Sequence, residues 1–178
     1  MKFLKYFAYG SNMLTERLRR RVPSTTPLGP ARLEGFELRF HKRGADGSAK
    51  CNVVADTDAC VHGVLFEIHS QERYLLDRAE GLGYGYELVD IELDTSQGAV
   101  EAFCYVASPD HIDRSLLPFR WYKDFVVHGG VEHQLPAPYV QRIRQIEALS
   151  DTSTHRARKN RGILNGSRHL QPLEPAAE

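Results

Sequence analysis

A series of strand-like runs joined by short connections dominates the chain up to residue 107. The runs are residues 3–9, 31–42 ("ARLEGFELRFHK"), 51–56 ("CNVVAD"), 60–68 ("CVHGVLFEI"), 86–94 ("YELVDIELD") and 100–107 ("VEAFCYVA"). Within the second run, Phe36, Leu38 and Phe40 alternate with charged residues, as in a half-buried strand. The "TDA" at 57–59 is interpreted as a hairpin turn. Because short turns join antiparallel strands, whereas parallel strands need long crossovers, we expect a mostly antiparallel sheet curled into a barrel.

Helices are fewer than strands in this pattern. We expect one after Asn12, one over 70–80, one over 119–128 before "HGG" ends it, and one from "LPAPYV" at 135–140 onward. Trp121 and Phe125 are four residues apart in the third of these, so they share a face and are interpreted as core. The predicted class is α+β, with a few helices flanking the sheet.

The domain organisation follows from length and composition. A chain of 178 residues with 42% hydrophobic and 26% charged residues suits one globular domain with a sizeable core. After residue 149 the sequence becomes polar and contains no aromatic residue. Such a segment buries little apolar surface. We therefore predict a domain over 1–149 and a polar, mobile tail over 150–178.

Charge and cysteine content narrow the partners and the compartment. Lys and Arg total 23, as do Asp and Glu, so no overall field attracts nucleic acid or an anionic membrane. The start "MKFLKYFAYG" lacks the apolar centre of a signal peptide, and no run approaches the about 20 apolar residues of a membrane span. Three cysteines without C-x-x-C spacing are typical of reduced thiols. We expect a cytoplasmic protein without nucleic-acid or membrane partners, and a homodimer stays open.

The first candidate site is the end of the N-terminal strand, "YFAYGSNM" at 6–13. A strand that runs through Gly10 into a helix presents backbone N–H groups that favour an anionic or carbonyl oxygen. Gly10 lets the backbone approach a ligand closely, and Ser11 or Asn12 can cap the helix. The same pattern is also a common structural connection, so the turn alone does not establish a site.

The second candidate site is "LDRAEGLGYGY" at 76–86, in which Glu80 is the last helical residue and Gly81 the C-cap. A carboxylate there meets the negative end of the helix dipole, where Lys or Arg would be more stable. Tyr84 and Tyr86 follow and can supply phenol hydroxyls. These features suit a general base, although the same pattern also occurs where a glutamate simply points into water at a surface turn.

Other chemistries have weaker patterns. Ser11 lacks the Gly-x-Ser-x-Gly setting of a serine hydrolase, for which the base would be one of the histidines at 62, 69 and 128. His128 and His133 with Cys51 or Cys60 have no recognised metal-ligand spacing. Cys104 lies within an apolar strand and is interpreted as a packing residue.

Taken together, five segments resemble the gamma-glutamylcyclotransferase-like superfamily in order and spacing. They are "YFAYGSNM" at 6–13, "VHGVLFEI" at 61–68, "LDRAEGLGYGY" at 76–86, "WYKDFVVHGG" at 121–130 and "LPAPYVQRI" at 135–143. The resemblance covers about residues 3–149. It implies a compact mixed fold around a small, strongly bent, partly barrel-like sheet. It also implies an enzyme without cofactor or metal that cyclises a γ-glutamyl group to 5-oxoproline and releases an amino acid or amine.

The resemblance also assigns roles by position. Glu80 matches the general acid/base. The residues that match the substrate-binding positions are Tyr9, Gly10, Ser11, Asn12, Met13, Leu14, Tyr86 and Tyr122. Tyr84 competes with Tyr86, because "GLGYGY" can be aligned one residue either way.

Two questions about the ligand stay open at this stage. The glutathione-directed branch has a Gly-Tyr-Gly-Ser core followed by an aliphatic residue, whereas here Ala8 precedes Tyr9 and Asn12 follows Ser11. This departure favours γ-glutamyl amino acids or γ-glutamylamines as substrates. The alternative function is a non-catalytic module that binds γ-glutamyl or amino-acid conjugates in the same pocket.

Overall fold

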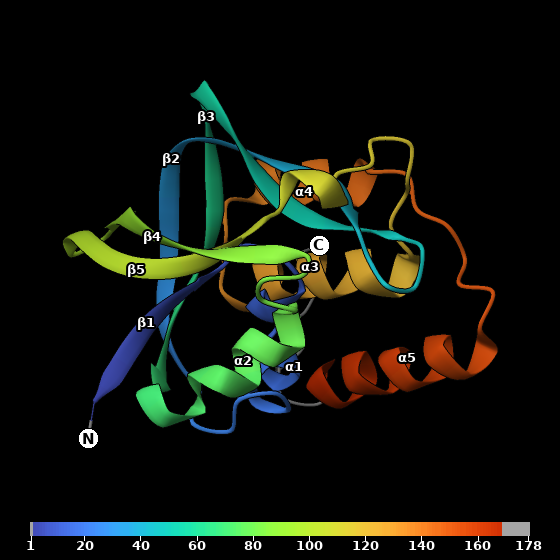
Figure 1. Cartoon of the computed structure of the whole chain (residues 1–178), viewed down its shortest axis with the longest axis horizontal. Coiled ribbons are helices and arrows are strands. Elements are labelled where there is room, and N and C mark those ends of the chain that lie inside the picture. Colours follow the sequence, from blue (N-terminus) through green and yellow to red (C-terminus); the bar gives the residue numbers. More distant parts are fainter. Residues whose placement is uncertain (1, 169–178) are drawn as a thin grey trace, which may run out of the picture.

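The computed structural model describes residues 2–168, in which five strands close into a barrel in the order β1-β3-β2-β4-β5 (Figure 1). The strands are β1 (Phe3–Ala8), β2 (Thr26–Arg43), β3 (Ala49–His69), β4 (Tyr86–Thr95) and β5 (Gly98–Ala107). Neighbouring strands are antiparallel, except that β1 and β5 pair in parallel at Tyr6 and Phe103 and so close the barrel. The predicted α+β class and mostly antiparallel, barrel-like sheet are confirmed.

The hairpin predicted at 57–59 is wrong, because β3 continues through this segment. Glu34 of β2 pairs with Cys60, whereas Phe36 pairs with Ala55. One residue of β2 therefore faces four residues of β3, and the ladder bulges there. The polar "DTD" residues have the composition of a turn, with the Asp58 N–H donating to the Asp56 carboxylate over 3.1 Å. They bend a long strand rather than reverse it.

The helices gather mainly on one side of the barrel, with α2 below the strands in Figure 1. They are α1 (Thr15–Arg19), α2 (Arg73–Glu80), α3 (Arg120–Glu132), α4 (Ala137–Gln145) and α5 (Thr154–Arg168), with 3₁₀ turns η1 (Ser11–Met13), η2 (Ser70–Glu72) and η3 (Pro109–His111). Within the described part of the chain, no helix has the length and apolarity that crossing a membrane requires. The prediction that "HGG" ends the third helix is wrong, since α3 runs through both glycines to Glu132.

The prediction of a mobile tail is wrong for residues 154–168, which form α5 against α3 and α1. Ala157, Ile163 and Leu164 are buried there and supply the apolar contact that a mostly polar segment conceals. Asp151 fixes the start of this segment by accepting hydrogen bonds from Trp121 Nε1 over 2.8 Å and from Arg156 over 2.6 Å. The remaining residues of the predicted tail, 169–178, lie outside the described residues.

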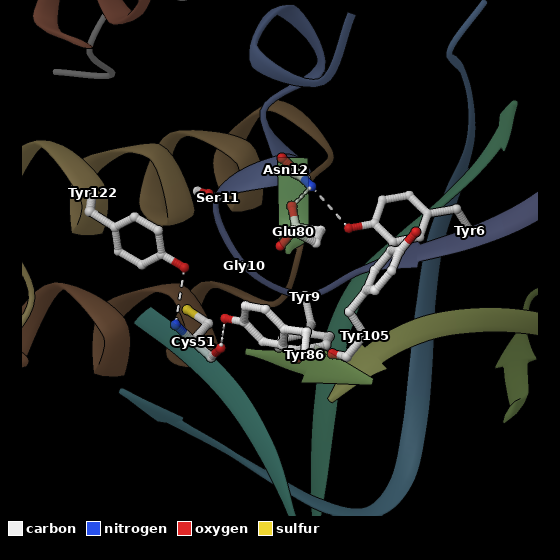
Figure 2. A pocket seen from close by; sticks show the side chains of 10 residues that line it. All are labelled: Tyr6, Tyr9, Gly10, Ser11, Asn12, Cys51, Glu80, Tyr86, Tyr105 and Tyr122. Carbon is white, nitrogen blue, oxygen red and sulfur yellow. Dashed lines mark hydrogen bonds between the residues drawn. The ribbon is translucent and has the colours of Figure 1, made fainter. Parts of the chain in front are cut away.

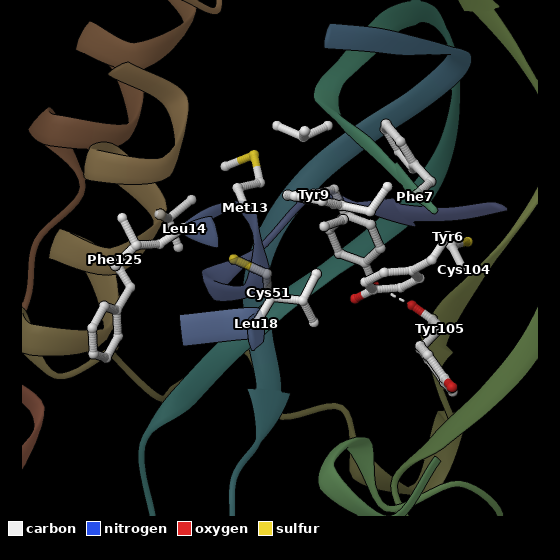
Figure 3. Close-up of a cluster of buried hydrophobic side chains, with 14 of the residues drawn as sticks. Tyr6, Phe7, Tyr9, Met13, Leu14, Leu18, Cys51, Cys104, Tyr105 and Phe125 are labelled. Atoms are coloured by element: carbon white, nitrogen blue, oxygen red, sulfur yellow. Dashed lines mark hydrogen bonds between the residues drawn. The ribbon is translucent and has the colours of Figure 1, made fainter. Parts of the chain in front are cut away.

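The core joins the barrel to α3 through the segment that follows β1. Figure 3 shows Met13 and Leu14 between Phe125 of α3 and the strand residues Phe7 and Tyr9. Trp121 and Phe125 are buried, as predicted. Gly129 makes this contact close: a Cβ there would lie 2.6 Å from the backbone of Met13 and Leu14. The first glycine of "HGG" is thus a packing position, at which the η1 turn lies directly against α3.

We expect Gly129→Ala to destabilise the protein by about 1–3 kcal/mol, because the added methyl group meets backbone atoms that cannot rotate away. Urea unfolding followed by circular dichroism measures this. Gly162→Ala in α5 is the matched control, since a Cβ there has open space. Equal stability of the two variants would contradict the close packing of α3 on the η1 turn.

Candidate active site

The turn after β1 forms one wall of a small recess. Ten residues line the recess: Tyr6, Tyr9, Gly10, Ser11, Asn12, Cys51, Glu80, Tyr86, Tyr105 and Tyr122 (Figure 2). Its volume is about 30 Å³. A water-sized group needs about 10–15 Å³ of such space, so the recess has room for one polar end of a ligand and not for a whole molecule. Seven of the nine site residues expected from the sequence line it, and the structure brings the two candidate sites together.

Met13 and Leu14, the other two expected residues, do not line the recess. Their side chains are buried in the core, so they anchor the loop rather than face a ligand. Gly10 faces the recess, and a Cβ on it would lie 3.1 Å from Cys51 Cβ and 3.4 Å from the Tyr122 hydroxyl. The first N–H groups of the η1 turn have no acceptor within the turn. The loop can therefore donate to an oxygen bound in the recess.

Glu80 stands at the mouth of the recess, at the end of α2. Gly81 is its C-cap with φ +70°, as the sequence predicts. Asn12 Nδ2 donates to Glu80 Oε1 over 2.8 Å, and Arg21 Nη1 donates to the same oxygen over 2.7 Å. Arg21 also donates to Asn12 Oδ1 over 2.9 Å, which closes a three-residue ring of hydrogen bonds.

This ring leaves one oxygen of Glu80 available. Oε2 has no hydrogen-bond partner among residues 2–168, and the Glu80 side chain is 16% exposed. The carboxylate is thus oriented through Oε1 while Oε2 can meet a ligand. The sequence predicted Asn12 as a substrate-binding residue and did not single out Arg21 from the several cations of "RLRRRV", which follows the turn.

Two phenols hold the opposite side of the recess through one residue of β3. The Cys51 N–H donates to the Tyr122 hydroxyl over 3.0 Å, and the Tyr86 hydroxyl donates to the Cys51 carbonyl oxygen over 2.6 Å. Figure 2 shows both hydroxyls directed at this peptide. Burial raises the pKa of both phenols far above the usual value, so they keep their protons. Of the two tyrosines that the sequence left in competition, Tyr86 lines the recess, whereas Tyr84 is 79% exposed.

Three further tyrosines complete the wall nearest the strands. Asn12 Nδ2 donates to the Tyr6 hydroxyl over 3.0 Å, the Tyr9 hydroxyl donates to the Tyr105 carbonyl oxygen, and the Tyr105 hydroxyl donates to Asp77 Oδ1 over 2.6 Å. Tyr6, Cys51 and Tyr105 were not predicted as site residues. They lie on strands, where the one available signal was a phenol hydroxyl within an apolar run at Tyr6 and Tyr105, and Cys51 gave no such signal.

The rival chemistries find no matching geometry here. The histidines at 62, 69 and 128 do not line the recess with Ser11. Burial raises the pKa of the Cys51 thiol to about 12, so it is not a thiolate nucleophile. Cys104 is buried in the core, as predicted. In the described residues no three His, Cys, Asp or Glu side chains gather into a metal-binding group.

Comparison with known proteins gives one consistent result. Residues 6–124 match the family model described as gamma-glutamyl cyclotransferase, AIG2-like. The gamma-glutamylcyclotransferase of Homo sapiens is 30% identical over 148 residues, which span 80% of this chain and 78% of that protein. The Mus musculus protein of the same name is 31% identical over the same shares. A solved structure of a gamma-glutamyl cyclotransferase superposes with a TM-score of 0.79 at 25% identity, covering 90% of this chain and 99% of the other.

We expect Tyr122→Phe to cost about 1–3 kcal/mol of stability, because the Cys51 N–H would lose its buried acceptor. Chemical unfolding of the purified variant measures the loss. Tyr84→Phe removes the same hydroxyl from an exposed ring and should change stability by less than about 0.5 kcal/mol. Similar small effects in both variants would show that the phenol does not support the Cys51 peptide.

Proposed function

The chain belongs to the AIG2-like gamma-glutamyl cyclotransferase family, and we propose that Glu80 is the general acid/base of its cyclotransferase reaction. The observation that carries this assignment is the position of the carboxylate. Glu80 lines both the recess and the larger cleft outside it, with Oε1 held by Asn12 and Arg21 and Oε2 unpartnered among the described residues. A base must be oriented and still reach its substrate, and this arrangement meets both needs.

The reaction joins the α-amino nitrogen of a γ-glutamyl compound to its own γ-carbonyl carbon. The nitrogen loses two protons as the α-ammonium becomes the lactam N–H, and the bond from the carbonyl carbon to the leaving nitrogen breaks. The leaving nitrogen gains two protons and departs as an ammonium group. We assign both proton transfers to Glu80, which accepts one proton at a time from the attacking nitrogen and returns it to the leaving nitrogen. Intramolecular attack of this kind gains rate from a substrate held in a folded geometry.

The walls of the recess are suited to hold that geometry. In our proposal the Ser11 and Asn12 N–H groups bind a glutamyl oxygen, and the phenols of Tyr86 and Tyr122 confine the substrate against Glu80. Because the η1 turn is anchored in the core and both phenols are fixed at Cys51, the walls need little reorganisation as charge develops on the carbonyl oxygen. The small recess takes one end of the glutamyl group, and the leaving group extends into the outer cleft.

The compartment and the ligand class are finer parts of this proposal. Cys51, Cys60 and Cys104 are free thiols, which supports a cytoplasmic location. The non-catalytic binding module predicts that ligands bind without turnover. An oriented carboxylate with a free oxygen favours the enzyme, since a module that only binds a γ-glutamyl group has no need of a base.

We expect Glu80→Gln to lower kcat for 5-oxoproline release by roughly 100-fold or more, because the amide cannot accept the proton. Release is measured by mass spectrometry with γ-glutamyl amino acids and γ-glutamylamines. Glu92→Gln, an exposed position on β4, is the matched control and should keep wild-type activity. A Glu80→Gln enzyme with more than a tenth of wild-type kcat would exclude Glu80 as the acid/base. Binding without release from the wild-type chain would favour the binding module.

A further inference from the structure

A large cationic cleft lies directly outside Glu80. Its volume is about 770 Å³, and it shares Ser11, Glu80, Tyr86 and Tyr122 with the recess. Six of its lining side chains carry positive charge at neutral pH: Arg17, Arg21, Lys42, Arg43, Lys50 and Arg78. Two acidic residues, Glu80 and Asp110, line the same cleft. The chain as a whole has equal numbers of acidic and basic residues, so the excess of positive charge is a local property of this cleft.

Four of these cations are already paired or hydrogen-bonded, and one of the four, Arg17, donates only to a neutral group, Asn160 Oδ1, over 3.5 Å. Arg21 pairs with Glu80 over 2.7 Å, and Lys50 pairs with Asp46 over 2.8 Å. Arg43 donates to the Asp110 carbonyl oxygen over 3.0 Å. Arg17, Lys42 and Arg78 have no carboxylate within ion-pair distance among the described residues. Arg78 is exposed, so water solvates its charge, whereas the other two are largely removed from water.

Lys42 and Arg17 are the two cations of the cleft that are both largely buried and without an ion-pair partner in the described part of the chain. Lys42 is 9% exposed, and its ammonium lies 4.7 Å from the centre of the Tyr86 ring. The Arg17 guanidinium lies 4.3 Å from the centre of the Phe125 ring, and its buried Nε has no hydrogen-bond partner in the described structure. Burial lowers the pKa of both groups, because the charged forms lose hydration. A buried cation without an anion is unfavourable, and a bound carboxylate would relieve this at both positions.

We propose that this cleft is a subsite for the carboxylates of the leaving group, and that the preferred substrate is a γ-glutamyl derivative of an acidic amino acid. The inference rests on the proposed function, since it is Glu80 that places the scissile bond at the boundary between recess and cleft. A released glutamate or aspartate carries two carboxylates, which can meet Lys42 and Arg17. A neutral amino acid offers one carboxylate, and a simple amine offers none.

The test compares three substrates on the full chain: γ-glutamylglutamate, γ-glutamylalanine and γ-glutamylethylamide. We expect kcat/KM for 5-oxoproline release to fall in that order, by roughly 10-fold for each carboxylate lost. Added salt should weaken the preference, since screening acts on the charge pairs. Equal kcat/KM for the three compounds would overturn the subsite while leaving the cyclotransferase intact.

Lys42→Met separates the subsite from the catalytic groups. We expect it to lower kcat/KM for γ-glutamylglutamate by roughly 10-fold and for γ-glutamylethylamide by less than about 3-fold. Lys5→Met, the same change at an exposed position on β1, is the control and should alter neither. An equal loss on both substrates would assign Lys42 a structural role and overturn the subsite.

The failure of the proposed function is distinguishable from the failure of this inference. If none of the three compounds is converted, the enzyme assignment fails, and calorimetric binding of the same compounds tests the subsite alone. Tighter binding of γ-glutamylglutamate than of γ-glutamylethylamide would then support an anion subsite. Equal binding would overturn it.

Discussion

The backbone of the η1 turn lies against α3 with no side chain between them at Gly129, and the site depends on this contact. Met13 and Leu14 are buried on one side of the turn, so Ser11 and Asn12 face the recess on the other. Asn12 in turn holds Glu80, which lies 68 residues later in the chain. Core packing therefore fixes the carboxylate indirectly, through a short turn whose two faces serve different purposes.

The barrel contributes a second constraint at Cys51. The N–H of this residue donates to the Tyr122 hydroxyl, and its carbonyl oxygen accepts from the Tyr86 hydroxyl. Buried backbone groups require partners, so these two phenols are needed for the fold as well as for the wall of the recess. This explains how a pocket lined by tyrosines can persist in the core: each hydroxyl has a structural partner, and none depends on a ligand.

Local patterns predicted much of the site, and contacts between distant segments account for what was missed. Glu80 with its Gly81 cap and the Gly10 turn could be recognised because each lies in a contiguous motif. Arg21 could not be chosen among neighbouring arginines, since its role depends on where α2 ends. The predicted hairpin failed because turn-forming residues also suit a bulge, and the predicted tail failed because three apolar residues and Asp151 suffice to dock α5.

The charged residues of the site form two groups: a closed part, in which Glu80 is paired with Arg21, and an open part, in which Arg17 and Lys42 have no ion-pair partner among the described residues. Arg21 and Asn12 saturate one oxygen of Glu80, and breaking a part-buried pair of this kind would leave an uncompensated charge. Arg17 and Lys42 form no ion pair with a carboxylate of residues 2–168, although burial makes their charge unfavourable. In the proposed reaction the closed part supports proton transfer, which every γ-glutamyl substrate requires in the same way. In the proposed subsite the open part meets the leaving group, so we expect substitutions there to change substrate choice more than the chemistry at Glu80.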